Sequence, residues 1–502
     1  MSVPTLEPVR ETTRPARQIN VAPPPVGLRY DLTRFRLLRT LLRKRWFQFM
    51  LVLPNQAIFW LVIVAGVVGR QIAPANIATA ITWYLWFCIV FVLMVGVGRG
   101  WCAMCPFGGA GEWLQRKSLF KRKDGSVGLG LKYPERLAKY GLLPAVGIFL
   151  LMTFVEEYFN VAGPGAPLDT ALLVAFILVF SGTTFLVFER RVFCRYLCPL
   201  SGLIGTVGQM GAVAGFRAKD RNVCLTCETK ECMRGSERGY GCPWYEYPGQ
   251  QSANAFCGLC SECYKNCSKD NIGLFVQPPL TSLYSNVKRR MDVAVGIALL
   301  AGLVWFQQLN AMTWYGNLEA RVNSLIGWPH YPNPILYLFF CLIPLPVLYG
   351  LGRATAAGSR LSTGGRMGWR RLFVDWAYIL IPVVGMDYLA RQLPKFFDHV
   401  LRLVAVVSDP LGLGWNLFGT AHLKVANDAL TSQNGTVIAQ IVVVLLGLAG
   451  SLYAAWRIRQ HTAEYAGLTA AARRVQGALI ALSVLAVAGM QVWWYVLMKA
   501  AE

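Results

Sequence analysis

Histidine is scarce in this chain, which has four histidines among its 502 residues. They are His330, His399, His422 and His461, and no two of them lie together at the middle of an apolar segment. Because a haem inside a membrane needs axial ligands at that depth, we expect no haem and assign these histidines ordinary surface roles.

Acidic residues are also few, since 26 Asp and Glu stand against 49 Lys and Arg and leave a net charge of +23. No motif that reads DNA or RNA accompanies this charge, so we expect no nucleic-acid partner. In an apolar chain such an excess is typical of cytoplasmic loops and of contact with anionic lipids.

The N-terminus lacks the apolar core of a signal peptide. Residues 1–30 are rich in Pro and Arg, which predicts a disordered cytoplasmic tail. Residues 31–46 place apolar side chains at helical spacing among basic ones. They are expected to form either an amphipathic helix on the inner leaflet or a basic extension of the first membrane span.

Long apolar runs, by contrast, are abundant, and 55% of the residues are hydrophobic. A run of about 20 apolar residues is long enough to cross a bilayer as a helix. We therefore predict an all-α polytopic membrane protein with about nine transmembrane helices. The predicted spans are 49–68, 77–97, 138–155, 168–188, 291–310, 334–352, 372–392, 434–455 and 475–497.

Basic residues are concentrated in every second segment between these spans. Because basic loops remain in the cytoplasm, we expect the N-terminus inside and, after an odd number of spans, the C-terminus outside. The segments expected inside are 1–48, 98–137, 189–290, 353–371 and 456–474.

Eight of the 14 cysteines lie between residues 224 and 267, in two groups. The second group has the spacing C-x2-C-x2-C-x3-C of a bacterial ferredoxin half, in which three cysteines hold one [4Fe–4S] cluster and the fourth reaches another. The first group is a stretched version that ends in Cys-Pro. Crossing the fourth ligands predicts two [4Fe–4S] clusters, one on Cys224, Cys227, Cys232 and Cys267 (set A) and one on Cys257, Cys260, Cys263 and Cys242 (set B).

Disulfides and two zinc sites are the alternatives, because short C-x2-C pairs also suit tetrahedral zinc. So many thiols at a ferredoxin spacing favour iron–sulfur clusters. We expect residues 221–275, called the insert below, to form a small cytoplasmic α+β domain of the 2[4Fe–4S] ferredoxin-like type.

An internal repeat precedes the insert. The first two spans, and again the next two, are followed by Arg, an aromatic residue, two cysteines, Pro and Gly. Parallel repeats tend to pack about a pseudo-two-fold axis along the membrane normal, which brings equivalent groups together. The thiols that this axis would gather, called the repeat cysteines below, are Cys102, Cys105, Cys194 and Cys198.

Several chemistries suit the repeat cysteines. They could hold a third iron–sulfur cluster, act as a redox-active dithiol pair, bind a soft metal such as Cu(I), or be buried packing residues. We favour a shared metal centre.

A four-span core with two Cys-Pro motifs, followed by a two-cluster ferredoxin-like insert, resembles the NosR/NapH/CcoG family of polyferredoxin-like membrane iron–sulfur proteins. The resemblance covers about residues 45–290. It implies electron transfer at a bacterial inner membrane, with the insert in the cytoplasm and the C-terminus in the periplasm. It also implies the electron-transfer subunit of an oxidoreductase of the quinol dehydrogenase type, with a periplasmic or membrane redox protein as partner.

Four regions follow from these patterns. They are a basic tail and amphipathic helix (1–48), the four-span core (49–220), the insert (221–275) and a five-span C-terminal membrane region (276–502).

The expected function is to link a quinol or cytoplasmic donor to a respiratory or periplasmic redox partner. A bilayer core is about 30 Å thick, so cytoplasmic clusters need a bridge across it, and a quinone from the membrane pool is the simplest bridge. The alternatives are a copper-binding and copper-reducing assembly factor for a respiratory metalloenzyme, and a transporter that senses redox state.

Two acidic residues fall inside the seventh predicted span. Asp375 and Asp387 are 12 residues apart, which places them on similar faces of a helix. Acids at such depth mark a proton or substrate route, unless both lie near the span ends and are hydrated.

Overall fold

The computed structural model describes most of the chain. The predicted disordered tail lies almost entirely outside the described residues. The described ranges are 29–116, 128–163, 167–285, 289–363, 368–424, 428–461 and 468–501.

Within these ranges, eight helical segments are long and apolar enough to cross a membrane, against the nine that the sequence predicted. The ninth prediction, 138–155, falls on the short helix α7 and the 16-residue helix α8. A helix of 16 residues spans about 24 Å, which is less than a bilayer core of about 30 Å. The eight segments are Arg45–Val68, Ile77–Gly96, Pro167–Val187, Met291–Leu309, Pro334–Ala357, Trp369–His399, Gln433–His461 and Ala470–Leu497.

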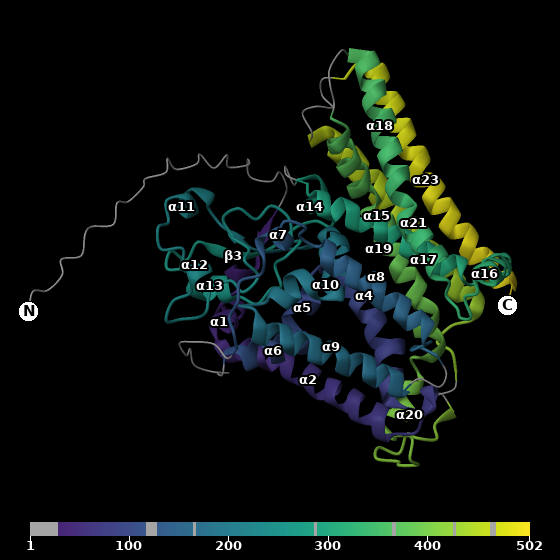
Figure 1. The fold of residues 1–502 in the computed structure, drawn as a ribbon. Helices are drawn as coiled ribbons and strands as arrows, with labels where there is room; N and C mark the ends of the chain where they lie inside the picture. The colour runs from purple at the N-terminus through teal and green to yellow at the C-terminus, as the bar shows by residue number, and fades with distance from the viewer. Residues whose placement is uncertain are drawn as a thin grey trace, which may run out of the picture.

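The helices of the predicted four-span core carry the repeat. Helix α2 packs against α9, and Gly66 permits this approach because a Cβ there would lie 2.5 Å from the Cβ of Ala171. Figure 1 shows α2 and α9 running side by side. Their bounds are α2 (Arg45–Val68), α3 (Ile77–Thr79) continued by a π-helical stretch (Ala80–Trp86) into α4 (Phe87–Gly96), α7 (Glu135–Ala138), α8 (Leu143–Tyr158) and α9 (Pro167–Val187).

Short helices follow each half of the core. In each Cys-Pro sequence, the Cys follows one helical turn and the Pro is the first residue of the next helix. Pro is well suited to this first helical position. These helices are α5 (Gly100–Met104), α6 (Pro106–Arg116) and α10 (Pro199–Val207).

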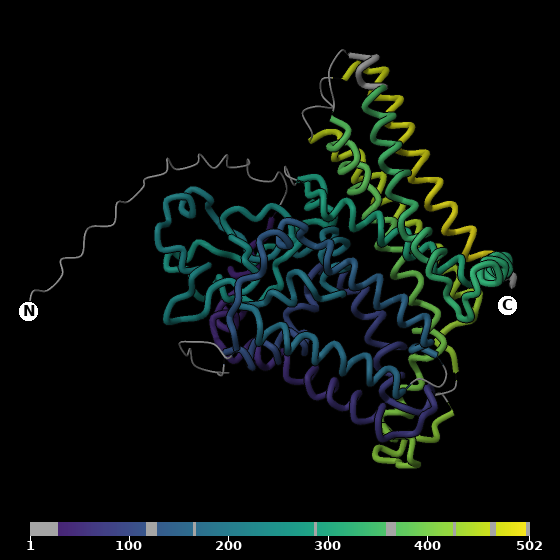
Figure 2. The backbone as a smooth tube through the Cα atoms, in the orientation of Figure 1, coloured from purple at the N-terminus to yellow at the C-terminus, as the bar shows by residue number. Residues whose placement is uncertain are grey.

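The insert gathers at one end of this core, opposite α20 (Figure 2). Its strands form a small antiparallel sheet in the order β1-β3-β2, with Phe216 opposite Leu274. The sheet begins before the predicted insert and takes its edge strand from the predicted basic tail. The elements are β1 (Tyr30–Asp31), β2 (Val213–Ala218), β3 (Ile272–Val276), α11 (Arg221–Leu225), α12 (Glu231–Arg234) and α13 (Glu262–Asn266).

The predicted amphipathic helix is shorter than expected. Helix α1 (Arg36–Arg43) is separated from α2 by Lys44, which is extended. Arg43 of this helix forms an ion pair with Asp270 of the insert at 2.7 Å, and Leu42 is buried. Helix α1 therefore packs on the insert rather than continuing the first span.

The C-terminal region is built around one long helix, α19 (Trp369–His399). The most apolar stretch of this helix is 89% buried. It packs against neighbours in its own region and against α4 and α10, which joins the two membrane regions. The other elements are α14 (Thr281–Tyr284), α15 (Met291–Leu309), α16 (Thr313–Ile326), α17 (Pro334–Leu342), α18 (Pro344–Thr363), α20 (Arg402–Val406), α21 (Gln433–His461) and α23 (Ala470–Ala501).

Candidate iron–sulfur sites

The first Cys-Pro motif is a tight helical turn. Cys102 lies in α5, and Cys105 follows it in an extended conformation with φ −65° and ψ 125°. The residue before a proline is driven out of the helical region, so Pro106 imposes this conformation. The motif thus turns its second thiol away from the helix axis.

The second motif has one more residue between its cysteines, and a π-helical turn over Phe193–Leu197 absorbs it. The amide of Cys198 donates to the carbonyl of Phe193 at 2.8 Å, five residues back. Cys198 then has φ −68° and ψ 120°, nearly the angles of Cys105. The two repeats therefore present their second thiols in the same way despite their different spacing.

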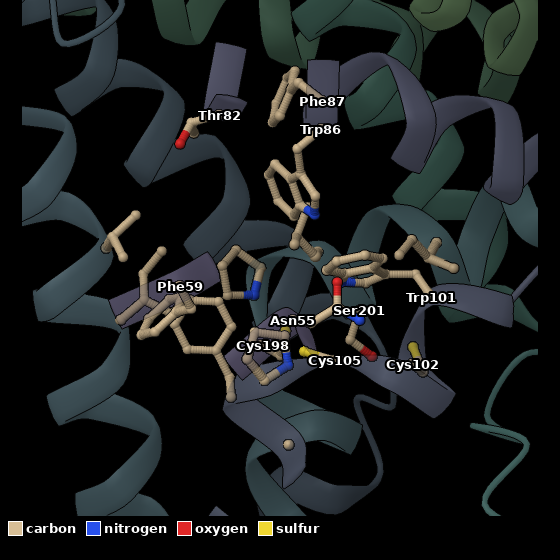
Figure 3. Close-up of a pocket in the computed structure, with 18 of the residues that line it drawn as sticks. Asn55, Phe59, Thr82, Trp86, Phe87, Trp101, Cys102, Cys105, Cys198 and Ser201 are labelled. Carbon is tan, nitrogen blue, oxygen red and sulfur yellow. The ribbon is translucent and has the colours of Figure 1, made fainter. Parts of the chain in front are cut away.

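All four repeat cysteines line one cavity of about 380 Å³ inside the four-span core. In Figure 3, Cys102, Cys105 and Cys198 lie at one end of it, with Trp86 and Trp101 beside them. Burial raises the pKa of Cys105 to about 11, so a free thiolate is disfavoured at this site. Metal binding would supply the positive charge that a thiolate needs here.

Two buried arginines stand beside the repeat cysteines, each three residues before the first cysteine of its motif. Arg99 donates to the hydroxyl and the carbonyl of Ser201 at 2.6 and 3.0 Å. Its side chain is 0% exposed, and in the described part of the chain its Nε and Nη1 have no hydrogen-bond partner. Buried unpaired donors of this kind fit an anionic group held by the neighbouring thiols.

The second arginine, Arg191, connects the repeat to the insert. It interacts electrostatically with Cys194 and also with Cys260 of set B. The ring of Trp244 lies 5.0 Å from the guanidinium of Arg99 and 6.0 Å from that of Arg191. One indole and one guanidinium thus link the repeat cysteines to set B.

Set A comes together as the crossed spacing predicted. Its cysteines line one small pocket at the edge of the insert. Asn271 ties two of them, since its backbone N–H donates to the sulfur of Cys267 and its side chain to the sulfur of Cys224, both at 3.3 Å. The fourth cysteine of the second group therefore lies with the first group.

Set B also comes together. The thiol of Cys263 interacts with those of Cys242, Cys257 and Cys260. The backbone N–H groups of Phe216 and Leu259 donate to the sulfur of Cys257. Hydrogen bonds from amides to sulfur are a feature of protein-bound iron–sulfur clusters.

The backbone on either side of Cys260 has an uncommon conformation. Leu259 and Ser261, on either side of this cysteine, have φ of +55° and +59°. Non-glycine residues with positive φ are uncommon and gather at functional sites, where surrounding structure offsets their cost. Both sets of insert cysteines thus fit the clusters that their spacing predicts.

Among the described residues, no three His, Cys, Asp or Glu side chains converge closely enough to hold one metal ion. A four-iron cluster is larger than one ion, so its thiolates stand further apart than the ligands of one zinc or copper ion.

The comparison with known families concerns the repeat. A family described as "4Fe-4S binding domain" matches residues 79–126 and 168–217. Each matched segment contains one Cys-Pro motif. The match supports an iron–sulfur protein. Together with the eight membrane-length helices, it indicates that this iron–sulfur protein transfers electrons at a membrane. No curated protein and no solved structure matches the chain.

The two intramembrane acids lie elsewhere. Asp375 pairs with Arg289 at 2.7 Å and with Arg371 at 3.3 Å. Asp387 is buried and accepts hydrogen bonds from Gln308, Gln491 and Tyr495 at 2.7, 2.8 and 2.7 Å, respectively. Neither acid lines the cavity of the repeat cysteines.

None of the four histidines lines the cavity of the repeat cysteines or the pocket of set A. The rings of His330, His399 and His461 pack against Tyr158, Tyr84 and Tyr284, respectively.

Sequence reasoning missed the buried groups around the cysteines. Both repeats carry Arg three residues before their first cysteine, and this spacing was a usable signal for Arg99 and Arg191. No comparable signal marks Trp244, because its role depends on contacts with two arginines that are far away in the sequence.

Proposed function

We propose that this protein exchanges electrons between its cytoplasmic insert and a quinone bound in the cavity of the four-span core. One observation carries the proposal: the repeat cysteines form part of the wall of an apolar cavity of about 380 Å³. That volume is within the range of small-molecule sites. A lipid-soluble carrier in this cavity would lie directly against the thiols.

Three cysteine groups would hold iron–sulfur clusters, namely set A, set B and the repeat cysteines. A bound [4Fe–4S] cluster supplies one-electron chemistry at each. The match of the 4Fe-4S family to both copies of the repeat supports a cluster there as well.

The arrangement supports an order of transfer. Set A lies at the protein surface, where Cys224 and Cys227 are partly exposed. Arg191 interacts with cysteines of both set B and the repeat. Set B therefore stands between the surface and the cavity, and electrons would pass from one end of this series to the other.

A quinol that gives up two electrons also releases two protons, so the cavity needs a proton acceptor. Glu156 is the acidic residue among the described residues that line it. Lys395 and Arg391 of α19 interact electrostatically with Glu156. We assign Glu156 the role of accepting one of the two protons at a time and passing it to water, so that both protons leave the cavity in turn.

The test is reduction by a soluble quinol analogue. Purified protein in detergent is mixed with the analogue, and cluster reduction is followed by electron paramagnetic resonance. Leu173→Trp fills the cavity and should slow reduction at least about tenfold, whereas Leu172→Trp, at the neighbouring lipid-facing position, should not. Equal rates in the two variants would contradict a quinone site in this cavity.

Metal analysis tests the cluster assignment. Two insert clusters predict about eight iron atoms for each chain, and a third cluster at the repeat raises this to about twelve. Copper that is lost when the repeat cysteines are replaced by serine would instead support the copper-reducing alternative.

A further inference from the structure

Beside set B lies a group of buried side-chain donors that have no hydrogen-bond partner among the described residues. Arg217 of β2 is 2% exposed, and in the described part of the chain its Nη1 and Nη2 have no hydrogen-bond partner. The same holds for Nε and Nη2 of Arg29 and for the amide nitrogen of Gln251. All of these unpaired groups are donors.

The strand backbone holds Arg217 in this position. Its Nε donates to the carbonyl of Ala214 at 2.8 Å, so the side chain folds back along its own strand. Gly215, with φ +87°, brings that strand against set B, because a Cβ there would lie 3.2 Å from the sulfur of Cys257 and 3.3 Å from Nε2 of Gln251. Gly215 thus packs against both Cys257 and Gln251, two positions before Arg217 on the same strand.

The charges around Arg217 are mostly repulsive. Burial is the largest influence and lowers the pKa of its guanidinium, and Arg29 and Arg221 lower it further. Cys257 acts in the opposite direction and raises the pKa of Arg217. Burying an unpaired charge is unfavourable in free energy, and burying several like charges together is more so. An anion at Cys257 would offset this cost.

Two ordinary roles of arginine do not account for Arg217. A residue that serves only to keep a loop in the cytoplasm, or that binds lipid headgroups, must present its charge to water or to the membrane surface. Arg217 presents its charge to the interior of the insert.

We propose that Arg217 and Arg29 are the counter-charge of an anionic [4Fe–4S] cluster on set B, and that they raise its reduction potential. This inference rests on the proposed function, since it requires a cluster on these four cysteines. Reduction adds one negative charge to the cluster, so nearby positive charges stabilise the reduced form more than the oxidised form. The unpartnered donors of Arg217 and Gln251 are available to hydrogen-bond sulfur atoms of the cluster, and such bonds would act in the same direction.

The experiment is a redox titration of the purified full-length protein, monitored by electron paramagnetic resonance. Cys227→Ser and Cys260→Ser assign the two insert signals to set A and set B. In Arg217→Gln, we expect the reduction equilibrium of the set B cluster to become about tenfold less favourable, which corresponds to a fall of about 59 mV for one electron. Arg217→Lys keeps the charge and should retain most of the original potential.

The matched control is Arg238→Gln, an exposed arginine of the insert. Its charge is screened by water, so neither potential should move appreciably. If the Arg217→Gln protein does not assemble the set B cluster, the same redox titration is carried out on Arg29→Gln. This variant should also lower the reduction potential of set B alone.

Four results would overturn the inference. These are an unchanged set B potential in Arg217→Gln, an unchanged set B potential in Arg29→Gln, an equal fall in sets A and B, and a wild-type potential that follows chloride or phosphate concentration. The last would show that a free anion supplies the counter-charge. Wild-type protein without [4Fe–4S] signals would refute the proposed function itself, whereas normal signals with an unmoved potential would refute the inference alone.

Discussion

Buried charge is concentrated around the cysteines of this protein. Glu112 of α6 forms ion pairs with Arg191 and Arg116, and both Glu112 and Arg191 are almost fully buried. Because α6 follows the first Cys-Pro motif and Arg191 precedes the second, this carboxylate ties the two repeats together. It also holds the guanidinium that reaches Cys194 and Cys260.

Removing this carboxylate should be strongly destabilising. Glu112→Ala leaves Arg191 buried and unpaired, and we expect a loss of about 3–5 kcal/mol in the free energy of unfolding. Asp270→Asn breaks the exposed pair with Arg43, suits the positive φ of this position and should cost less than about 1 kcal/mol. Thermal unfolding in detergent measures both, and similar losses in the two variants would contradict the assignment.

The same pair makes stability depend on pH. Burial raises the pKa of Glu112, but Arg116 and Arg191 outweigh it, so the pKa lies below its usual value. The stabilisation is therefore present above the unfolded-state pKa of about 4.3 and is lost as the pH falls through the folded-state value. The Tm should fall in acid, and Glu112→Gln should flatten that part of the pH profile.

At the scale of elements, the two repeat turns are equivalent although their sequences differ in length. A helical turn carries Cys102 and a π-helical turn carries Cys194, and both lead to an extended cysteine before Pro. The π-helical turn restores the symmetry, because it accommodates the one additional residue.

This symmetry predicts that the repeat cysteines act as one centre. Cys102→Ser and Cys198→Ser should each abolish the same spectroscopic or metal signal and leave the two insert clusters intact. The double substitution should do no further harm, because a centre that has lost one ligand has already failed. Separate, additive losses would identify two independent dithiols.

Helix packing in the C-terminal region depends on a small residue. A Cβ at Gly447 of α21 would lie 2.9 Å from the Cβ of Met386 and 3.0 Å from the Cα of Val383, both in α19. Small residues allow membrane helices to approach closely.

Gly447→Leu should therefore separate α19 from α21 and destabilise the protein by about 1–3 kcal/mol, as overpacking usually does. Gly489→Leu on α23 is the matched control, because a Cβ at Gly489 has nothing within 4 Å. Unfolding in detergent compares the two, and equal stability would show that α19 and α21 tolerate a wider separation.

At the scale of the whole molecule, the membrane topology depends on the shortest core helix. Eight membrane-length segments alone would return the C-terminus to the side of the N-terminus, whereas α8 as a ninth crossing places the termini on opposite sides. A crossing by α8 requires local thinning of the bilayer or help from its neighbours.

We expect α8 to cross, with the insert inside and the C-terminus outside. A reporter fused after Glu502 should be active on the outer side only, and a protease site introduced near residue 240 should be resistant to protease added from outside. A reporter active only in the cytoplasm would show that α8 does not cross.

Hydropathy and cysteine spacing alone predicted the membrane class, eight of the spans and the crossed grouping of the insert cysteines. These features are local, since about 20 apolar residues form a span wherever they occur, and a ferredoxin spacing limits which thiols can share a cluster. The sequence also placed the two Cys-Pro motifs in a repeat.

Only the tertiary structure decided what surrounds those cysteines. Arg217 interacts electrostatically with Cys257, Arg191 does so with Cys260, and the strand Tyr30–Asp31 joins the sheet, all between segments far apart in the chain. The cavity beside the repeat cysteines likewise arises where several helices meet. Periodicity and spacing describe one segment at a time, so the charges and the cavity that govern the chemistry become visible only once the segments are packed together.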